Sequence, residues 1–426
     1  MLTALIAVPL VGVVVVLLAG RFGSRSMVRA GALGIASAEL AVAAVAAYAA
    51  YAGGGLTESF AAEADATFWH LALDGLSSPL VLLTALLGVV AVLASWEEER
   101  SPAGHHALLL ALTSAVMGVF LAADLITFYV AWEAVLIPMF FLIGVWGHER
   151  RRHAAMKFFV FTFAGSVLML VGLLIAMRET DQTTFAGILK AGLDPGPART
   201  VFWLLAAGFL VKVPVVGLHT WLPDAHVEAP TAGSIMLAGV LLKMGSYGLM
   251  RLSLPLAPAA FESARGLLAA LGICGIVYGA LMALAQSDLK RLVAYSSVSH
   301  MGFVVLAIAA ATPLAFGGAM LGMVSHGLVA GLLFLLVGAQ YERTHTRDLA
   351  KLGGLGTTLP RWSAVFVFAA LASAGLPGLS GFPGEFVAVT EAFAPFGWWA
   401  ALAASGAALA AAYNLNAVRR AVTGSG

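Results

Sequence analysis

Two lysines and one glutamate lie inside stretches of the sequence that are otherwise apolar. Lys212, Lys243 and Glu133 are each flanked by aliphatic and aromatic residues. A charged side chain at the bilayer centre costs about 2.5–3.5 kcal/mol on insertion scales, so such groups usually face a polar interior or an ion path. Burial favours a neutral amine, whereas a nearby carboxylate favours the charged form. A lysine and a glutamate that approach and separate could therefore take up and release a proton, with Glu133 and Lys212 as the pair.

Three histidines and a second glutamate extend this set of groups. His219 follows Lys212 across a proline and a glycine, His300 and His326 lie in long apolar runs, and Glu385 ends a run rich in glycine and proline. Imidazole changes charge near neutral pH and can pass on a proton. Each group also has a plainer interpretation: the histidines could be core residues or helix caps, and Glu385 could stabilise a helix start. On the residues alone, both interpretations stay open.

The composition places these groups in a membrane protein. Hydrophobic residues make up 61% of the 426 residues and charged residues only 11%, a balance that a water-soluble core of this size does not need. The 23 basic and 22 acidic residues give a net charge of +1, which favours neither nucleic acid nor an acidic partner. With a single cysteine, Cys274, the chain can form no internal disulfide. The sequence predicts no metal site and no cofactor.

The apolar runs predict an all-α, polytopic fold. A helix needs about 20 residues to cross the hydrocarbon core, and about thirteen runs reach this length. The first run lacks the basic start and the cleavage site of a removable signal peptide, so we expect it to be retained. The predicted spans are 1–20, 28–52, 74–96, 104–122, 124–147, 154–177, 200–226, 230–250, 264–286, 290–311, 313–341, 361–395 and 397–418.

Lysine and arginine are unevenly divided between the two sides of this topology. Most of the 23 basic residues, including the cluster at 150–152, fall in loops on one side. Positive charge in short loops marks the cytoplasmic side. We therefore expect a multi-pass protein of the cell (inner) membrane with its N-terminus outside and its C-terminus in the cytoplasm, which requires an odd number of spans.

Two predicted spans contain residues that break helices. Pro214 and Gly217 follow Lys212, and residues 375–385 hold two prolines and four glycines. Proline removes a backbone donor and clashes with the preceding turn. Irregular backbone survives at membrane depth only where it is buried in protein or lines a wet cavity. Both breaks therefore predict discontinuous helices beside polar sites.

The spacing of the breaks predicts an internal repeat. The breaks lie about 160 residues apart, as do the spans starting near 104 and 264, each of which opens a set of five. Because five is odd, the second set must be inverted, the plan in which broken helices form ion sites. The predicted domains are N-terminal peripheral transmembrane helices 1–103, a first five-helix repeat 104–252, a second, inverted five-helix repeat 264–418 and a cytoplasmic tail 419–426.

Several long motifs carry a family resemblance. The chain reads YVAWEAVLIPM at 129–139, WLPDAH at 221–226 followed by APTAGS at 229–234, and RLVAYSSVSHMG at 291–302. These runs closely resemble the antiporter-like membrane subunits of proton-translocating NADH-quinone oxidoreductase (complex I), the family of bacterial subunit M and mitochondrial subunit 4. The resemblance extends from about residue 70 to 395.

The resemblance implies a proton channel in the membrane arm of a respiratory translocase. Other membrane-arm subunits and membrane lipid would be its partners, and NADH oxidation and quinone reduction would occur in other chains. Subunit M has a glutamate at the position of Glu385, where the antiporter relatives usually have lysine. The expected proton route runs from the cytoplasm to Lys212, through Lys243 with His219, His300 and His326, and outward by Glu385. Family members usually have fourteen spans, one more than we count here.

Two other functions stay open. The family also includes subunits of multisubunit Na⁺/H⁺ antiporters and of membrane-bound hydrogenases, and a scaffold subunit without conduction is the other possibility. Some further charged residues are expected to do no chemistry. We expect Glu39 to be an interface or pairing residue, and Asp74 and Asp124 to be solvated at span ends. Asp224, His226 and Glu228 are expected to shape an entrance.

Overall fold

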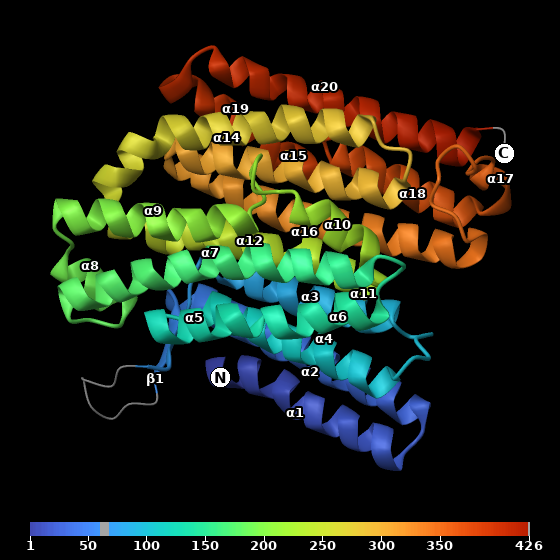
Figure 1. Cartoon of the computed structure of the whole chain (residues 1–426), viewed down its shortest axis with the longest axis horizontal. Helices are drawn as coiled ribbons and strands as arrows, with labels where there is room; N and C mark the ends of the chain where they lie inside the picture. Colours follow the sequence, from blue (N-terminus) through green and yellow to red (C-terminus); the bar gives the residue numbers. More distant parts are fainter. Residues whose placement is uncertain (60–67, 425–426) are drawn as a thin grey trace. The chain divides into compact units, whose positions relative to one another are not determined.

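The computed structural model describes residues 1–59 and 68–424 and is built almost entirely of helices. Figure 1 traces them in chain order by colour. By their internal contacts the residues form two compact units, each described here by itself. The first contains Met1–Lys212, Glu228–Met236 and Val240–Ser263, and the second contains Val213–Val227, Leu237–Gly239 and Ala264–Gly426.

The first unit contains the N-terminal helices and the helices around both buried lysines. Ser24 starts the second helix, because its side chain accepts a hydrogen bond from the Met27 amide. Helices α7 and α9 pack closely, since a Cβ on Gly208 would lie 2.7 Å from the Gly165 carbonyl oxygen. Its elements are α1 Leu2–Phe22, α2 Arg25–Gly53, β1 Leu56–Ser59, β2 His70–Leu73, α3 Ser78–Ala94, α4 Pro102–Leu121, α5 Leu125–Ala134, α6 Leu136–Trp146, α7 Arg151–Thr180, α8 Phe185–Ala191, α9 Pro195–Lys212, α11 Thr231–Met236, α12 Leu242–Gly248, η2 Leu249–Ser253 and α13 Leu254–Leu256.

The second unit contains the C-terminal helices. Asp288 and Thr312 cap the starts of two of them by accepting hydrogen bonds from backbone amides. Helices α14 and α15 touch along small residues: a Cβ on Gly302 would lie 2.6 Å from the Gly272 carbonyl oxygen. Its elements are α10 Trp221–Glu228, most of α14 Pro258–Leu284, α15 Leu289–Ala310, α16 Pro313–Thr344, α17 Leu355–Thr358, α18 Pro360–Ser373, α19 Gly381–Phe396, α20 Trp399–Val418 and η3 Arg419–Thr423, while η1 Leu237–Leu241 is divided between the units.

Ten helices among the described residues are long and apolar enough to cross a membrane. The predicted count of thirteen is therefore not confirmed. Three of the expected spans do not match a single long helix. The span expected at 74–96 is the helix α3, which has 17 residues, and the spans expected at 200–226 and 361–395 are each divided into shorter helices. The ten are Leu2–Phe22, Arg25–Gly53, Pro102–Leu121, Leu125–Trp146, Arg151–Thr180, Thr231–Leu256, Pro258–Leu284, Leu289–Ala310, Pro313–Thr344 and Trp399–Thr423.

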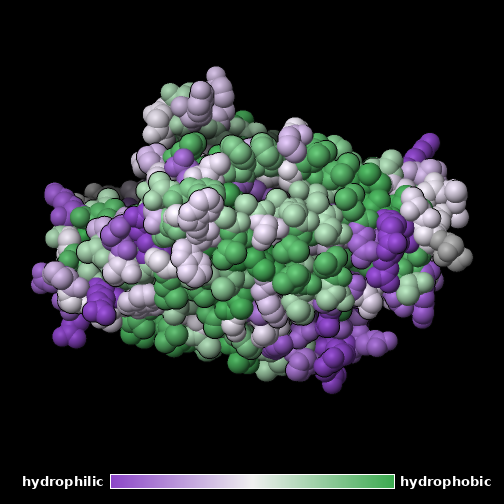
Figure 2. All heavy atoms as spheres, turned by 90° about the horizontal axis from the view of Figure 1, so that it is seen from above, coloured by the Kyte–Doolittle hydropathy of each residue, from purple (hydrophilic) through white to green (hydrophobic). Residues whose placement is uncertain are grey.

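The surface agrees with a multi-pass membrane protein. Figure 2 shows hydrophobic residues over the broad middle of one face and hydrophilic residues toward its margins. Helix α1, for example, exposes the large apolar side chains of Leu10, Val11, Val14 and Leu18. Contiguous exposed apolar surface of this kind is unfavourable in water and suits contact with lipid.

Both predicted helix breaks are confirmed. Helix α9 ends at Lys212 and α10 begins at Trp221, with Pro214 and Gly217 at φ 30° and 96° between them. Helix α18 ends at Ser373 and α19 begins at Gly381; Gly375 and Gly378 between them adopt φ 69° and 93°, which glycine tolerates without strain. The inverted relation of the two repeats stays a prediction.

The structure also shows a hairpin that the sequence did not predict. Strands β1 and β2 pair antiparallel, with Leu56 opposite Leu73 and Ser59 opposite His70. The buried Asp124 carboxylate accepts a hydrogen bond from the His70 amide at 2.8 Å and caps α5 through the Thr127 amide at 2.7 Å. Asp124 is thus a structural cap rather than a solvated group. At the other end of the chain, the expected tail 419–426 starts with the helical turn η3, and residues 425–426 lie outside the described residues.

Candidate functional site

Lys212 lies at the end of α9 in an apolar and aromatic enclosure. Its side chain is only 1% exposed, and its Nζ forms no hydrogen bond within the described part of the chain. Nζ instead faces two aromatic rings, with their centroids 5.4 Å away in Trp132 and 5.5 Å away in Phe158. The nitrogen thus has aromatic neighbours rather than hydrogen-bond acceptors.

Glu133 adjoins this enclosure on α5. The helix is interrupted at Val135, because Pro138 has no N–H to donate to the Ala134 carbonyl one turn earlier. The Glu133 carboxylate is close enough to interact electrostatically with Lys212 and with the Tyr129 hydroxyl. The ion pairs found among residues 1–59 and 68–424 do not include Glu133 with Lys212. The structure therefore places the two groups as neighbours with their direct pair unformed.

Lys243 lies on the short helix α12 and is fully buried. The helix is preceded and followed by the π-helical segments η1 and η2, a geometry that is rare and often found at functional sites. A ring contact joins this segment to the Lys212 enclosure. A Cβ on Gly248 would lie 2.4 Å from the Phe209 ring, and Phe209 packs against Trp132 with ring centroids 5.5 Å apart.

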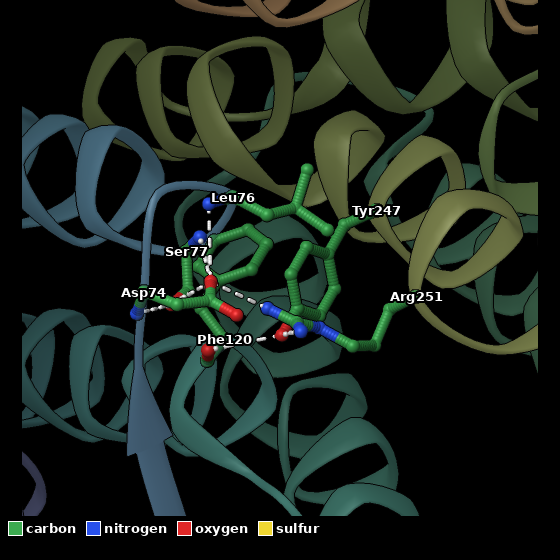
Figure 3. Close-up of polar contacts among 6 residues, drawn as sticks. All are labelled: Asp74, Leu76, Ser77, Phe120, Tyr247 and Arg251. Atoms are coloured by element: carbon green, nitrogen blue, oxygen red, sulfur yellow. Dashed lines mark hydrogen bonds and ion pairs between the residues drawn. The ribbon is translucent and has the colours of Figure 1, made fainter. Parts of the chain in front are cut away.

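A polar cluster follows Lys243 on the same segment (Figure 3). Arg251 donates to Asp74 Oδ1 at 2.7 Å and to the Tyr247 hydroxyl at 3.1 Å, and Tyr247 in turn donates to the Phe120 carbonyl. Asp74 lies in the loop before α3, where its carboxylate also accepts from the Ser77 amide. Partial burial opposes ionisation of Asp74, but the hydrogen bond and charge of Arg251 outweigh it and lower its pKa to about 2. Asp74 is thus an anchor for η2 that stays partly exposed to solvent.

His300 and Glu385 form a second polar site, inside the second unit. His300 Nδ1 donates to Glu385 Oε1 at 2.7 Å, since a carboxylate only accepts. The other ring nitrogen, Nε2, lies 3.1 Å from both the Ser373 and the Tyr413 hydroxyls. Asn414 donates to Ser373 Oγ at 3.2 Å, which leaves the Ser373 proton free for His300. A proton could thus reach Nε2 from a hydroxyl and leave through Nδ1.

A small cavity adjoins this second site. His300, His326 and Glu385 line it together with Ser296 and Ser373, and its volume of about 20 Å³ is room for about one water molecule. The rings of His300 and His326 are 5.7 Å apart. The structure thus brings together three of the residues selected from the sequence, from helices α15, α16 and α19.

His219 lies in the irregular segment between the two half-helices, buried beside aromatic rings. Its ring centroid is 5.1 Å from that of Tyr278 and 6.4 Å from that of Tyr295. Further along the same segment, Asp224 accepts from Arg291 at 3.2 Å, and the Val227 carbonyl accepts from Arg347 at 2.9 Å. The three residues expected to form an entrance are thus held at different places. Asp224 is held to α15, and His226 stacks on Phe334 of α16 with ring centroids 4.5 Å apart. Glu228 accepts from the Arg150 amide at 2.9 Å.

Sequence reasoning missed the neutral partners of the charged groups. Trp132 directly precedes Glu133 in the chain, which was a usable signal, whereas Phe158 is one of many phenylalanines in α7. Tyr413 and Asn414 stand in an alanine-rich helix that appeared to be only a membrane span. Within the described residues no group of three or more His, Cys, Asp or Glu side chains could hold a metal ion.

Comparisons with known proteins identify the family of the chain. Residues 122–410 match the model of the NADH:quinone oxidoreductase/Mrp antiporter transmembrane family. NADH-quinone oxidoreductase subunit M of Pseudomonas aeruginosa is 48% identical over 372 residues, covering 83% of this chain and 72% of the relative. The subunit M of Escherichia coli K12 is 44% identical over 367 residues, with coverage of 83% and 72%.

Solved structures show the same fold. A chain of respiratory complex I from Thermus thermophilus matches with a TM-score of 0.92 and 32% identity, covering 100% of this chain and 90% of that one. A chain of the Mrp complex from Dietzia sp. matches at 23% identity with a TM-score of 0.87, covering 100% and 80%, and so supports the fold alone. With two thirds of its length in the family match and relatives above 40% identity, the chain belongs to the NADH:quinone oxidoreductase/Mrp antiporter transmembrane family.

Proposed function

We propose that this chain is the antiporter-like, proton-translocating membrane subunit of a respiratory NADH:quinone oxidoreductase. The observation that carries the proposal is the buried Lys212, which ends a broken helix beside Glu133. Intramembrane ionisable groups usually mark ion paths. Relatives at 43–48% identity are named NADH-quinone oxidoreductase subunit M, and others at 46–47% are named NAD(P)H-quinone oxidoreductase chain 4, which favours this function over the Na⁺/H⁺ antiporter and hydrogenase alternatives.

In this proposal the Glu133 and Lys212 pair is the switch of the first unit. When the carboxylate approaches, the lysine keeps its proton; when the two separate, the apolar enclosure favours its release. Lys243 would then accept the proton. In the second unit, His300 would pass a proton from the Ser373 or Tyr413 hydroxyl to Glu385, with His326 and a water molecule in the adjoining cavity as further carriers. His219 would serve as a relay in the first helix break.

The energy for pumping would come from partner subunits. Moving one charge against the membrane potential costs about 2.3 kcal/mol per 100 mV. We propose that this chain itself holds no cofactor and no redox site, and that NADH oxidation and quinone reduction take place in other subunits of the assembly. Membrane-arm neighbours would transmit the movement to Glu133. The chain would lie in the inner membrane with its N-terminus outside and its C-terminus in the cytoplasm.

The test is proton uptake by the assembled complex reconstituted in vesicles. Glu133→Gln keeps shape and hydrogen-bonding capacity but removes the charge, and Lys212→Ala removes the proton carrier. We expect both variants to assemble and to lose most of their coupled pumping. Glu179→Gln, on the exposed end of α7, is the matched control and should pump normally.

Other outcomes identify the alternatives. Normal pumping by both variants, per assembled complex, would show that the pair is structural and that the chain is a scaffold. Proton uptake that needs sodium rather than NADH would assign the chain to an antiporter assembly.

A further inference from the structure

The enclosure around Lys212 is made of aromatic faces rather than of acceptor atoms. Trp132 and Phe158 come from α5 and α7, and both are buried with at most 1% of their surface exposed. Both rings lie within the roughly 6 Å range over which a ring quadrupole attracts a cation. Nζ makes no hydrogen bond within the described residues. The faces of these two rings are therefore the groups at close range that can attract its charge. We propose that Trp132 and Phe158 bind the Lys212 ammonium as the alternative partner to Glu133 during proton transfer, an inference that rests on the proposed function.

The packing around Trp132 supports a role for its face. The ring is held by Phe128 and Phe209, with centroids 5.7 Å and 5.5 Å away. Its indole Nε1 is buried and makes no hydrogen bond within the described part of the chain. Buried tryptophans normally find an acceptor for this donor. The position of Trp132 therefore gives its ring face a contact with Lys212 and leaves its N–H without a hydrogen bond. In most buried tryptophans it is the N–H that has the polar contact.

The order of residues gives the lysine two partners within a short reach. Trp132 and Glu133 are consecutive on α5, and the lysine side chain is a flexible four-carbon stem. If the protonated lysine moved away from Glu133 and found no other partner, its ammonium would be unpaired in an apolar enclosure, at a high cost in free energy. The two rings remove that obstacle, because the lysine can leave Glu133 while still carrying its proton. Separation of the ion pair and release of the proton become two distinct steps.

The proposal predicts that the strength of the ring quadrupole sets the pumping rate. Tryptophans carrying one to four fluorine atoms, introduced at Trp132 in the full complex by stop-codon suppression, keep the shape of the ring but weaken its attraction for a cation. We expect proton uptake to fall with each added fluorine. The whole series should span about 2- to 30-fold, the rate equivalent of the cation–π range.

Two further variants and a control complete the experiment. Trp132→Phe, which keeps an aromatic face, should pump better than Trp132→Leu, which does not. The same fluorinated series at Trp362 is the matched control, because that buried indole stacks on Phe366 and donates to the Leu336 carbonyl. Its series should leave pumping unchanged.

The outcomes separate this inference from the proposed function. If Lys212→Ala stops pumping but the Trp132 series leaves it unchanged, the aromatic binding site is refuted and the function stands. If Lys212→Ala pumps normally, both are overturned. Equal losses in the Trp132 and Trp362 series would show a general effect of fluorine on folding, and would also refute the inference.

Discussion

The two helix breaks hold their ionisable groups in opposite ways. At the first, Lys212 faces aromatic rings and makes no hydrogen bond within the described residues. At the second, Glu385 accepts from His300, which is itself contacted by the hydroxyls of Ser373 and Tyr413. Chain breaks that look alike in sequence therefore create one site with few polar contacts and one that is saturated with them.

The difference bears on what each site can do. A buried ion without hydrogen bonds has a high free energy, so a small change in its surroundings alters its preferred charge. A network whose members are all satisfied resists such change and keeps its geometry. The comparison suggests that the first site switches and that the second site conducts.

Replacing the carboxylate of the second site tests the conducting role most severely. Glu385→Gln keeps an acceptor for the His300 Nδ1–H but cannot receive a proton. We expect pumping to fall by about 100-fold, the usual contribution of a proton-transferring group, with assembly intact. Glu342→Gln, exposed on α16, is the control. Unchanged pumping in the Glu385 variant would mean that this network is only structural.

A larger side chain at Gly248 tests the packing that surrounds the first site. Its new Cβ would lie 2.4 Å from the Phe209 ring, which packs on Trp132. For Gly248→Ala we expect the free energy of unfolding to fall by about 1–3 kcal/mol, as in other overpacked cores. The comparison variant is Gly266→Ala, where a Cβ meets no atom within 4 Å. Thermal unfolding of the full chain in detergent measures the stability of both variants. Equal unfolding midpoints would show that the Phe209 ring moves aside at no cost in stability.

Removing one hydroxyl tests how far the second site is saturated. Ser373→Ala deletes a partner of His300 Nε2 and of Asn414. The loss should be about 1–2 kcal/mol of unfolding free energy, because a buried donor is left unsatisfied, and pumping should fall only slightly since Tyr413 remains. Ser405→Ala, on the exposed side of α20, should have almost no effect. A loss of pumping as large as that of Glu385→Gln would show that Ser373, not Tyr413, delivers the proton.

The smallest expected effect concerns the anchor beside Lys243. Asp74→Asn removes the charge that pairs with Arg251 and should cost less than about 1 kcal/mol at neutral pH, because the pair is partly exposed. The pKa of Asp74 is lowered from 3.8 to about 2. The stability from this pair is therefore present above pH 3.8 and is lost as the pH falls toward 2. Unfolding curves of the wild type and the variant should converge over that interval, whereas a gap that persists at pH 2 would contradict the assignment.

The sequence predicted those features that depend on local chemistry. Pro214 removes a backbone donor and the glycines near Pro377 readily adopt positive φ, so the discontinuous helices could be foreseen and are confirmed. The charged residues stood out because ionised groups are rare in apolar runs. The count of thirteen is not confirmed, because among the described residues ten segments are long enough to span and the remaining three expected spans are the short helix α3 and the two that are divided at the breaks.

Features that depend on distant partners could not be foreseen. Asp74 was expected to be solvated, but it pairs with Arg251, 177 residues later in the chain. The hairpin β1–β2 joins strands that have no alternating pattern strong enough to identify them. The contact of Phe158 with Lys212 likewise depends on packing of α7 against α9 that no local signal encodes. Whether the predicted site residues carry protons stays a prediction for the measurements above.

The interrupted helices also bear on how the chain enters the membrane during synthesis. Helices α10, α18 and α19 have 8, 14 and 16 residues, or about 12, 21 and 24 Å at 1.5 Å per residue, against about 30 Å of hydrocarbon. None of them is long enough to cross alone, and the irregular backbone beside each needs protein or water around it at membrane depth. We therefore expect each broken segment to enter the membrane together with a flanking full-length helix, so that this chain is inserted in groups of helices rather than one span at a time.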